Sequence, residues 1–336
     1  MSAGPRLDPC LDDAPSSGTA CGTIDMSVVI CTAGRPAALA RMLASLATAD
    51  APRCSWEVLV VDNLPAHGQV DAVVAAHGRR LPLRVAAEPR AGLARARNRA
   101  IGEARGRYIV FADDDVTVDA GWLRAYEAAF EASPDVSVFG GPIVPVFERA
   151  SPRWVEAVRR HAPSSYAWLE ADASVVLSPL GEGGIQPFGA NFALRFDALS
   201  RAPFDVAWGR QPNRPRLLGY EEVLLVDALL RDGARGRWLP EARVLHHMPR
   251  SRCTRRYLDD YWYAVGWAEG VLTARGRAVG APAEADLLRR SQRRRRRRWR
   301  KVRWWAGPEK WVPALRDAAR ARGRCDGFAE AEAGTA

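Results

Sequence analysis

The chain has 336 residues, of which 48% are hydrophobic and 26% are charged. This composition is typical of a globular protein with one large domain and an appendage, or with two domains. No apolar run approaches the roughly 20 residues that a membrane-spanning helix needs. Six scattered cysteines without a CxxC pair favour neither a disulfide framework nor a zinc site, which indicates a reducing cytoplasm.

The net charge of +10 is concentrated in one segment. Residues 289–303 contain ten arginines, one lysine and no acid, so the rest of the chain is close to neutral. Lys301 and Lys310 are the only lysines, and such a preference for arginine is typical of a bacterial gene of high GC content. Residues 1–23 have no basic-then-apolar signal-peptide pattern and are predicted to form a disordered tail.

The first half of the chain alternates predicted strands and helices. Apolar runs predict strands at 26–31, 56–61, about 83–86 and 108–112. Helical spacing of apolar residues predicts helices between and after these strands, with faces made by Leu39, Met42, Leu43 and Leu46, by residues of about 93–104, and by Trp122, Leu123, Tyr126, Ala129 and Phe130. This alternation implies right-handed βαβ crossovers and a mostly parallel sheet. The half contains neither a GxGxxG dinucleotide fingerprint nor a GxxxxGK[ST] P-loop.

Three adjacent carboxylates, Asp113, Asp114 and Asp115, follow the strand at 108–112. Like charges this close repel, so their joint ionisation needs a counter-charge. A divalent cation is the usual one, and hard oxygen ligands suit Mg²⁺ or Mn²⁺. The cluster would lie at the carboxyl end of a strand, where open α/β sheets bind ligands. The alternative is a solvated acidic turn in which an Asp caps the next helix.

The second half is less regular and carries three further polar motifs. Gly189-Ala190-Asn191 is followed by a loop rich in Pro, Arg and Gly, and then by Glu221-Glu222. These two acids open a predicted helix with an apolar face of Leu224, Leu225, Ala228 and Leu229, closed by Gly233. His246-His247 precedes a helix predicted to pack on the body through Leu258, Tyr261, Trp262 and Val265.

The chain resembles the family 2 glycosyltransferases, which have the GT-A fold, over about residues 24–270. Seven motifs occur in the family's order: Thr32-Ala33-Gly34-Arg35, Asp62-Asn63, Gly92 to Asn98, Asp113 to Asp115, Gly189 to Asn191, Glu221-Glu222 and Pro240 to His246. The resemblance implies an α/β fold with a mostly parallel central sheet flanked by helices and, here, a C-terminal helical basic extension. It divides the chain into a glycosyltransferase domain at 24–250, with a nucleotide-binding half at about 24–145 and an acceptor half at about 146–250, and C-terminal helices with a basic tail at 251–336.

The resemblance also implies an activity and its participants. The reaction would be an inverting transfer of a sugar from a nucleotide-diphosphate donor, with a UDP-sugar favoured, to a hydroxyl of a carbohydrate, lipid-linked or small-molecule acceptor. Mg²⁺ or Mn²⁺ would assist departure of the nucleotide diphosphate. By position, the implied donor-binding residues are Thr32, Arg35, Asp62, Arg97, Asp113 and Asp114. The implied metal ligands are Asp115, the principal one, with Asp113 and His246.

Glu222 matches the family's catalytic base, which is more often Asp, with Glu221 as the neighbouring candidate and Asn191 as an acceptor-binding residue. A base near a helix N-terminus stays ionised but loses basicity. Each assignment has an ordinary alternative: helix-dipole acids for the glutamates, a turn former for Asp62, a solvent-facing Arg97, an Asn191 bonding its own backbone, and an ordinary His246. Only the joint order of the motifs favours function.

The basic segment Arg289–Trp305 combines arginines with Trp299, Trp304 and Trp305. It could lie on an anionic membrane surface, bind nucleic acid, or be a solvated charge run. We favour the membrane surface: the protein would be cytoplasmic and would bind the inner face of the plasma membrane. We expect no nucleic-acid partner.

Two rival functions remain for the chain as a whole. One is a sugar nucleotidyltransferase, although no lysine precedes residue 301, and the other is a non-enzymatic basic protein that binds nucleic acid or membrane.

Overall fold

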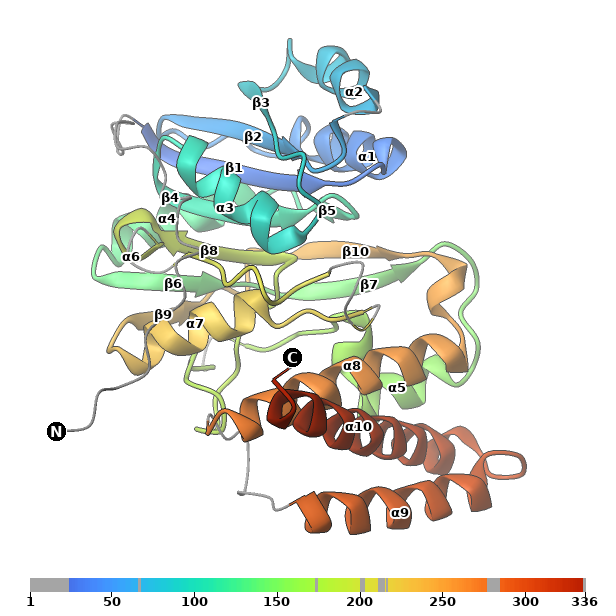
Figure 1. Cartoon of the computed structure of the whole chain (residues 1–336). Helices are drawn as coiled ribbons and strands as arrows, with labels where there is room; N and C mark the ends of the chain where they lie inside the picture. The colour runs from blue at the N-terminus through green and yellow to red at the C-terminus, as the bar shows by residue number, and fades with distance from the viewer. Residues whose placement is uncertain are drawn as a thin grey trace, which may run out of the picture.

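A seven-stranded sheet lies at the centre of the molecule, in the order β3-β2-β1-β4-β8-β6-β9 (Figure 1). The computed structural model describes residues 24–65, 68–172, 175–199, 203–210, 215, 217–276 and 285–334, so the predicted tail at 1–23 lies outside it. The strands of this sheet are β1 (Ile24–Thr32), β2 (Trp56–Asp62), β3 (Leu83–Ala87), β4 (Gly106–Asp113), β6 (Val136–Gly140), β8 (Asn191–Arg195) and β9 (Arg235–Trp238). Only β8 runs antiparallel to its neighbours among these described strands, which confirms the mostly parallel sheet.

Helices cover both faces of the sheet because its central strands are apolar on both sides. In β1, Val28 and Ile30 enter one buried cluster and Val29 enters the other, as the alternation of side chains along a strand requires. Helices α1 (Pro36–Leu46), α2 (Gln69–His77) and α4 (Trp122–Ala132) contribute buried residues to the first cluster. Helices α3 (Leu93–Glu103), α6 (Phe196–Leu199) and α7 (Glu221–Arg231) contribute to the second.

The predicted helix faces agree with the structure in the first half and differ in α7. The four predicted apolar residues of α1 are all buried, as are those of α4. In α7, Val226 and Leu230 are buried beside Leu225 and Leu229, whereas the predicted Leu224 and Ala228 are only partly buried. The buried face of α7 is therefore shifted around the helix relative to the predicted face. Leu224 packs instead on the C-terminal helices.

A second, three-stranded sheet has the order β5-β10-β7 and was not predicted. Its strands are β5 (Val116–Val118), β7 (Ile143–Phe147) and β10 (Val244–Met248). In the antiparallel β5–β10 pair, His246 lies opposite Val116. The pairing therefore brings His246 next to the aspartate turn that precedes β5, across 130 residues of sequence.

The C-terminal region forms helices rather than a free tail. Helix α5 (Val155–His161) and the short turns η2 (Pro163–Tyr166) and η3 (Arg250–Arg252) precede α8 (Arg255–Ala274), α9 (Ala285–Val302) and α10 (Pro308–Glu332). Helix α10 lies along α8 and carries α9 on its other side (Figure 1). This confirms the predicted C-terminal helical extension, and α10 buries Trp311, Val312 and Leu315 in a cluster with α5 and α8.

Glycines allow α8 and α10 to approach at backbone distance. A Cβ atom at Gly266 would lie 1.9 Å from the carbonyl oxygen of Arg320, and one at Gly323 would lie 2.0 Å from that of Tyr263. No side chain larger than hydrogen fits at either position. Within the described residues, no helix is both long enough and apolar enough to cross a membrane.

Candidate active site

The three aspartates that follow β4 turn toward different partners. Asp114 is fully buried and accepts a 2.6 Å hydrogen bond from the Thr32 hydroxyl, and it also forms an ion pair with Arg35. Burial, together with the neighbouring aspartates, raises the pKa of Asp114 to about 7, although Arg35 and Thr32 oppose the shift. The Thr32 hydroxyl therefore orients the Asp114 carboxyl group, which holds Arg35, and the implied contacts of these residues with a donor stay predictions.

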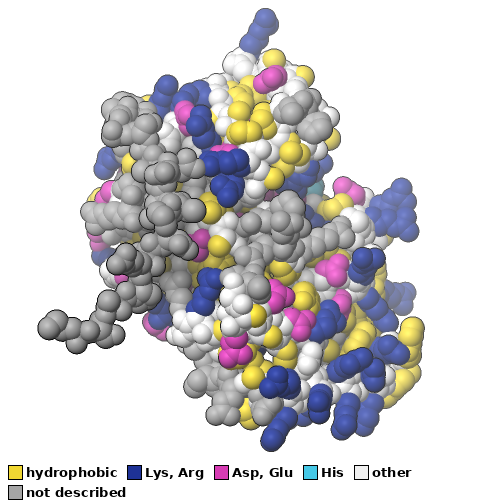
Figure 2. All heavy atoms as spheres, viewed as in Figure 1, with side chains coloured by type: hydrophobic (Ala, Val, Ile, Leu, Met, Phe, Trp, Pro, Cys, Tyr) yellow, Lys and Arg dark blue, Asp and Glu magenta, His cyan; other side chains and the backbone are white. Residues whose placement is uncertain are grey.

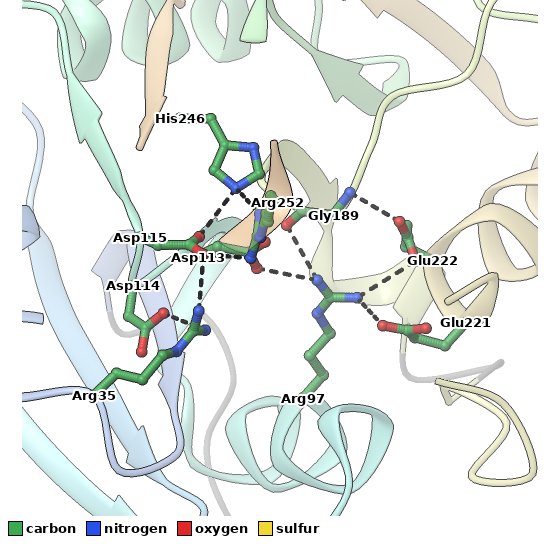
Figure 3. Close-up of polar contacts among 10 residues, drawn as sticks. All are labelled: Arg35, Arg97, Asp113, Asp114, Asp115, Gly189, Glu221, Glu222, His246 and Arg252. Atoms are coloured by element: carbon green, nitrogen blue, oxygen red, sulfur yellow. Dashed lines mark hydrogen bonds and ion pairs between the residues drawn. The ribbon is translucent and has the colours of Figure 1, made fainter. Parts of the chain in front are cut away.

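Asp115 is the centre of a cationic cluster (Figure 3). Its Oδ2 accepts hydrogen bonds from Arg35 Nη1 at 2.8 Å and from Arg252 Nη2 at 3.1 Å, and its Oδ1 lies 3.3 Å from His246 Nε2. Burial favours the protonated form, but His246, Arg35 and Arg252 outweigh it and hold the pKa of Asp115 well below its usual range. Asp115 is therefore an ionised carboxylate.

Arginine side chains supply the positive charge beside the three aspartates, for which a divalent cation was expected from the sequence. Asp113 Oδ1 faces Arg97 Nη2 at 3.6 Å rather than turning toward Asp115. The described residues contain no group of three or more His, Cys, Asp or Glu side chains that could hold a metal ion. The implied ligand set of Asp113, Asp115 and His246 is thus not preassembled, because one member pairs with an arginine on α3.

Arg97 joins the aspartate turn to the start of α7 (Figure 3). Its side chain is almost completely buried, with Nη1 donating to Glu221 Oε1 at 2.9 Å and Nη2 donating to the carbonyl oxygen of Gly189 at 3.1 Å. Nη1 also lies 3.7 Å from Glu222 Oε2. The alternative of a solvent-facing Arg97 is therefore wrong, since the guanidinium is buried and its Cζ lies 5.5 Å from the ring centroids of both Phe192 and Phe204.

The adjacent glutamates of α7 have different environments. Tyr220, which precedes them, has a φ of 80°, a backbone conformation that side chains rarely adopt and that recurs at functional sites. Glu221 is 2% exposed, and its burial, followed by the charge of Glu222, raises its pKa despite Arg97. Glu222 is only partly buried and accepts a 3.0 Å hydrogen bond from the Gly189 N–H. Glu222 is therefore the more accessible carboxylate.

Two other predicted residues have partners within the protein. Asn191 is completely buried: its Oδ1 accepts from Trp122 and Tyr126 at 3.0 Å each, and its Nδ2 donates to two carbonyl oxygens. The amide is saturated, so its geometry supports a structural role and gives no support to contact with an acceptor. Asp62 is buried and accepts a 2.9 Å hydrogen bond from the N–H of Leu64, as a turn former does.

One cavity of about 550 Å³ connects the acidic and cationic groups. The predicted residues that line it are Arg97, Asp113, Glu221, Glu222 and His246. Sequence reasoning did not single out Arg252, Gln186 or the wall that the C-terminal helices supply. The one available signal was the position of Arg252, shortly after His246-His247 in a stretch rich in Arg and Tyr.

Comparison with known proteins identifies the family of the chain that forms this cavity. The sequence profile described as Glycosyl transferase family 2 matches residues 27–199, just over half of the chain. The chain belongs to this family. The glycosyltransferase is also 26% identical over 258 residues to the succinoglycan biosynthesis protein ExoM of Rhizobium meliloti (strain 1021), a match that covers 75% of this chain and 76% of that protein.

Solved structures have the same fold at low sequence identity. The glycosyltransferase superposes on S. aureus TarS 1–349 in complex with UDP-GlcNAc with a TM-score of 0.52 and 17% identity, covering 92% of each chain. A second structure, of TarS 1–349 alone, gives a TM-score of 0.51 and 18% identity over 80% of this chain and 68% of that chain. These likenesses confirm the GT-A fold, and the family match excludes the rival nucleotidyltransferase and non-enzymatic interpretations.

Proposed function

We propose that this glycosyltransferase moves a sugar from a nucleotide-diphosphate sugar, with a UDP-sugar favoured, to an acceptor hydroxyl with inversion at the anomeric carbon. The observation that carries the proposal is the single cavity lined by Glu222 on one side and by Arg252 and His246 on another. A base and a cationic cluster are the two groups that such a displacement requires. The TarS structure named above was solved with UDP-GlcNAc, which supports the choice of donor class.

Glu222 is the proposed general base. Its Oε1 accepts the Gly189 N–H, which orients the carboxylate, and its position in the first turn of α7 favours the ionised form. The acceptor oxygen would form its bond to the anomeric carbon as the bond from that carbon to the diphosphate oxygen breaks, and Glu222 would take the hydroxyl proton. General-base catalysis of this kind contributes about 10²–10⁴ in rate.

The cluster around Asp115 is the proposed site of the diphosphate. Arg252 and His246 line the cavity, so their cationic and hydrogen-bonding groups can meet phosphoryl oxygens. A Mg²⁺ or Mn²⁺ ion also fits, because Asp115 is ionised and its buried Oδ1 accepts no hydrogen bond within the described structure. Asp115 and His246 would hold the ion and the donor would complete its coordination. When bound, the ion would neutralise the charge on the leaving diphosphate.

An anionic membrane surface is the proposed partner of α9. Six cationic side chains line one surface groove of this helix: Arg290, Arg293, Arg294, Arg297, Arg298 and Lys301. Figure 2, in the same view as Figure 1, shows dark blue basic side chains gathered over α9 along the lower edge of the molecule. Trp304 and Trp305, just beyond the helix, are 78% and 74% exposed. Basic side chains beside exposed tryptophans match anionic headgroups and the membrane interface.

The test of the donor site is a thermal-shift panel with UDP, GDP and dTDP, each with and without Mn²⁺, on the unmodified chain and on Asp115→Ala. A ligand at 100 times its dissociation constant stabilises the fold by about 2.7 kcal/mol, which is measurable as a shift of the melting temperature. We expect a metal-dependent shift with UDP that Asp115→Ala abolishes. Absence of a shift with every nucleotide would contradict the proposal.

A further inference from the structure

The side chain of Gln186 lines the cavity with an amide that has no partner. Both its Nε2 and its Oε1 are buried, and neither forms a hydrogen bond with any described residue. A buried polar group without a partner costs about 1–3 kcal/mol, so native proteins seldom leave one unless a ligand or a water satisfies it. The amide can donate a hydrogen bond through Nε2 and accept one through Oε1. A hydroxyl group can likewise donate and accept a hydrogen bond, so the two groups are suited to pair.

Aromatic side chains of α8 form another wall of the same cavity. Tyr257, Tyr261 and Trp262 line it, and the Tyr261 ring lies against the rings of the other two. The Tyr257 hydroxyl donates to the carbonyl oxygen of Ser165 at 2.8 Å, and Trp262 Nε1 donates to the Ser165 hydroxyl at 2.9 Å. The Tyr257 ring is stacked on Tyr166 with centroids 6.0 Å apart and planes 5° apart. These rings are a preformed apolar surface rather than adaptable side chains.

An ion pair between two C-terminal helices also lines the cavity. Arg320 of α10 donates to both carboxylate oxygens of Glu269 of α8, with Nε 3.0 Å from Oε1 and 2.9 Å from Oε2. Glu222, the proposed base, lines the same cavity as this pair and the aromatic wall. A molecule seated against Tyr257 and Tyr261 would therefore share the cavity with the group that activates the acceptor.

We propose that Gln186 and the aromatic wall of Tyr257 and Tyr261 form the acceptor subsite, and that the acceptor group bound there is a sugar ring. The inference rests on the proposed function, because it takes Glu222 as the base. A sugar ring presents C–H faces that pack on aromatic rings and hydroxyls that would satisfy the Gln186 amide. An acyl chain would leave that amide unsatisfied. The subsite extends the predicted acceptor half, 146–250, into α8.

The experiment uses the full chain with UDP-glucose, UDP-galactose and UDP-N-acetylglucosamine, and with the p-nitrophenyl glycosides of glucose, galactose, mannose and N-acetylglucosamine as probe acceptors. UDP release is measured with and without each glycoside, and UDP affinity is measured by calorimetry. The variants are Gln186→Leu, Tyr261→Ala and Tyr261→Phe. Gln69→Leu, an exposed glutamine at the start of α2, is the matched control.

We expect at least one glycoside to accelerate UDP release by the unmodified chain. Gln186→Leu should raise the KM for that glycoside at least tenfold while UDP affinity stays unchanged. Its melting temperature should equal or exceed that of the unmodified chain, because leucine removes an unsatisfied amide; a merely structural glutamine would lower it. Tyr261→Ala should raise the same KM, and Tyr261→Phe should restore it.

The outcomes separate this inference from the proposed function. Normal transfer by Gln186→Leu, or loss of UDP binding in that variant, would overturn the role of Gln186. Intact UDP binding with no response to any glycoside would overturn the sugar class of the acceptor and leave the donor site standing. Failure of the unmodified chain to bind UDP or another nucleotide would instead overturn the proposed function.

Discussion

The guanidinium of Arg97 donates a 2.9 Å hydrogen bond to Glu221, and this buried pair gives two adjacent glutamates separate roles. Glu221 is 2% exposed and is engaged by the arginine, whereas Glu222 is only partly buried and is oriented by the Gly189 N–H. Glu221 therefore anchors the first turn of α7. The accessible carboxylate beside it is the one that can exchange a proton with an acceptor.

Glu222→Gln should bind UDP with unchanged affinity and lose about 10²–10⁴ in the rate of sugar transfer, because the amide cannot accept the acceptor proton. Calorimetry with UDP and steady-state transfer assays measure the two effects separately. Glu221→Gln is the neighbouring control and should mainly lower the melting temperature, since Arg97 loses its closest buried counter-charge. Full turnover by Glu222→Gln would disprove its assignment as base.

Arg252→Ala should weaken UDP binding about 10-fold to 100-fold, because a charge-assisted hydrogen bond contributes about 1.5–3 kcal/mol. The variant should also need less Mn²⁺ for half-saturation, since Arg252 no longer competes for Asp115. Arg252→Lys keeps the charge without the planar fork and should give an intermediate affinity. Arg250→Ala, a change at an exposed arginine two residues earlier, should have little effect on either titration.

Asp114 should give the stability of the protein a measurable pH dependence. Its pKa is raised to about 7 in the fold, whereas an aspartate in an unfolded chain titrates near 3.9. Between about pH 4 and pH 7 the folded protein holds a proton that the unfolded chain releases, so the free energy of unfolding should fall as the pH rises. One such group contributes a slope of at most about 1.4 kcal/mol per pH unit.

The check is urea denaturation of the unmodified chain and of Asp114→Asn across that pH window. The asparagine does not titrate, so the slope should become flatter, and Glu221, whose pKa is also raised, should account for part of the remainder. Asp115 has a lowered pKa and should add stability that is lost only as the pH falls below the window. An identical slope in both proteins would contradict the assigned shift of Asp114.

Gly323→Ala should destabilise the chain by about 1–3 kcal/mol, because the added methyl group overlaps the backbone of α8. A Cβ atom there would lie 2.0 Å from the carbonyl oxygen of Tyr263 and 2.7 Å from the nitrogen of Trp267. Gly102→Ala is the matched control in α3, where a Cβ atom meets nothing within 4 Å. It should stabilise the chain by about 0.5–1 kcal/mol. Chemical denaturation compares the two.

The double change of Trp304 and Trp305 to serine should reduce co-sedimentation with vesicles that contain anionic phosphatidylglycerol, because it removes exposed side chains suited to the interface. UDP binding should not change. Val85→Ser, at a 42% exposed valine on β3, is the control for loss of surface apolar area. Raised salt should weaken binding of the unmodified chain. Failure to bind the vesicles, or preferential binding of RNA, would contradict the membrane proposal.

The sequence predicted those parts of the fold that depend on local periodicity. Leu39, Met42 and Leu43 identified a helix face because residues three and four apart meet on one side of a helix. The opposite pKa shifts of Asp114 and Asp115 were not predictable from the sequence. They depend on the positions of Arg35 and Arg252, which come from distant parts of the chain. The mixed sheet that holds His246 forms through pairings over long sequence separations.

The acceptor wall escaped prediction for a related reason. Gln186 lies outside the named strands and helices, so no periodic pattern marks it, and its significance follows from having no partner after folding. Tyr261 and Trp262 of α8 were predicted as packing residues, which is incomplete for both because each also lines the cavity. A residue that both packs and lines a cavity leaves the same signature in a sequence as one that only packs.

The glycine contacts between α8 and α10 have a consequence for how this enzyme can diversify. Because Gly266 and Gly323 leave no room for sliding or tilting, α8 cannot be replaced without a matching α10. The cavity wall on α8 and the cationic helix α9, which packs on α10, are therefore parts of one packed unit. We therefore expect an engineered exchange of the cavity wall to need α8, α9 and α10 together, with the junction placed after β10.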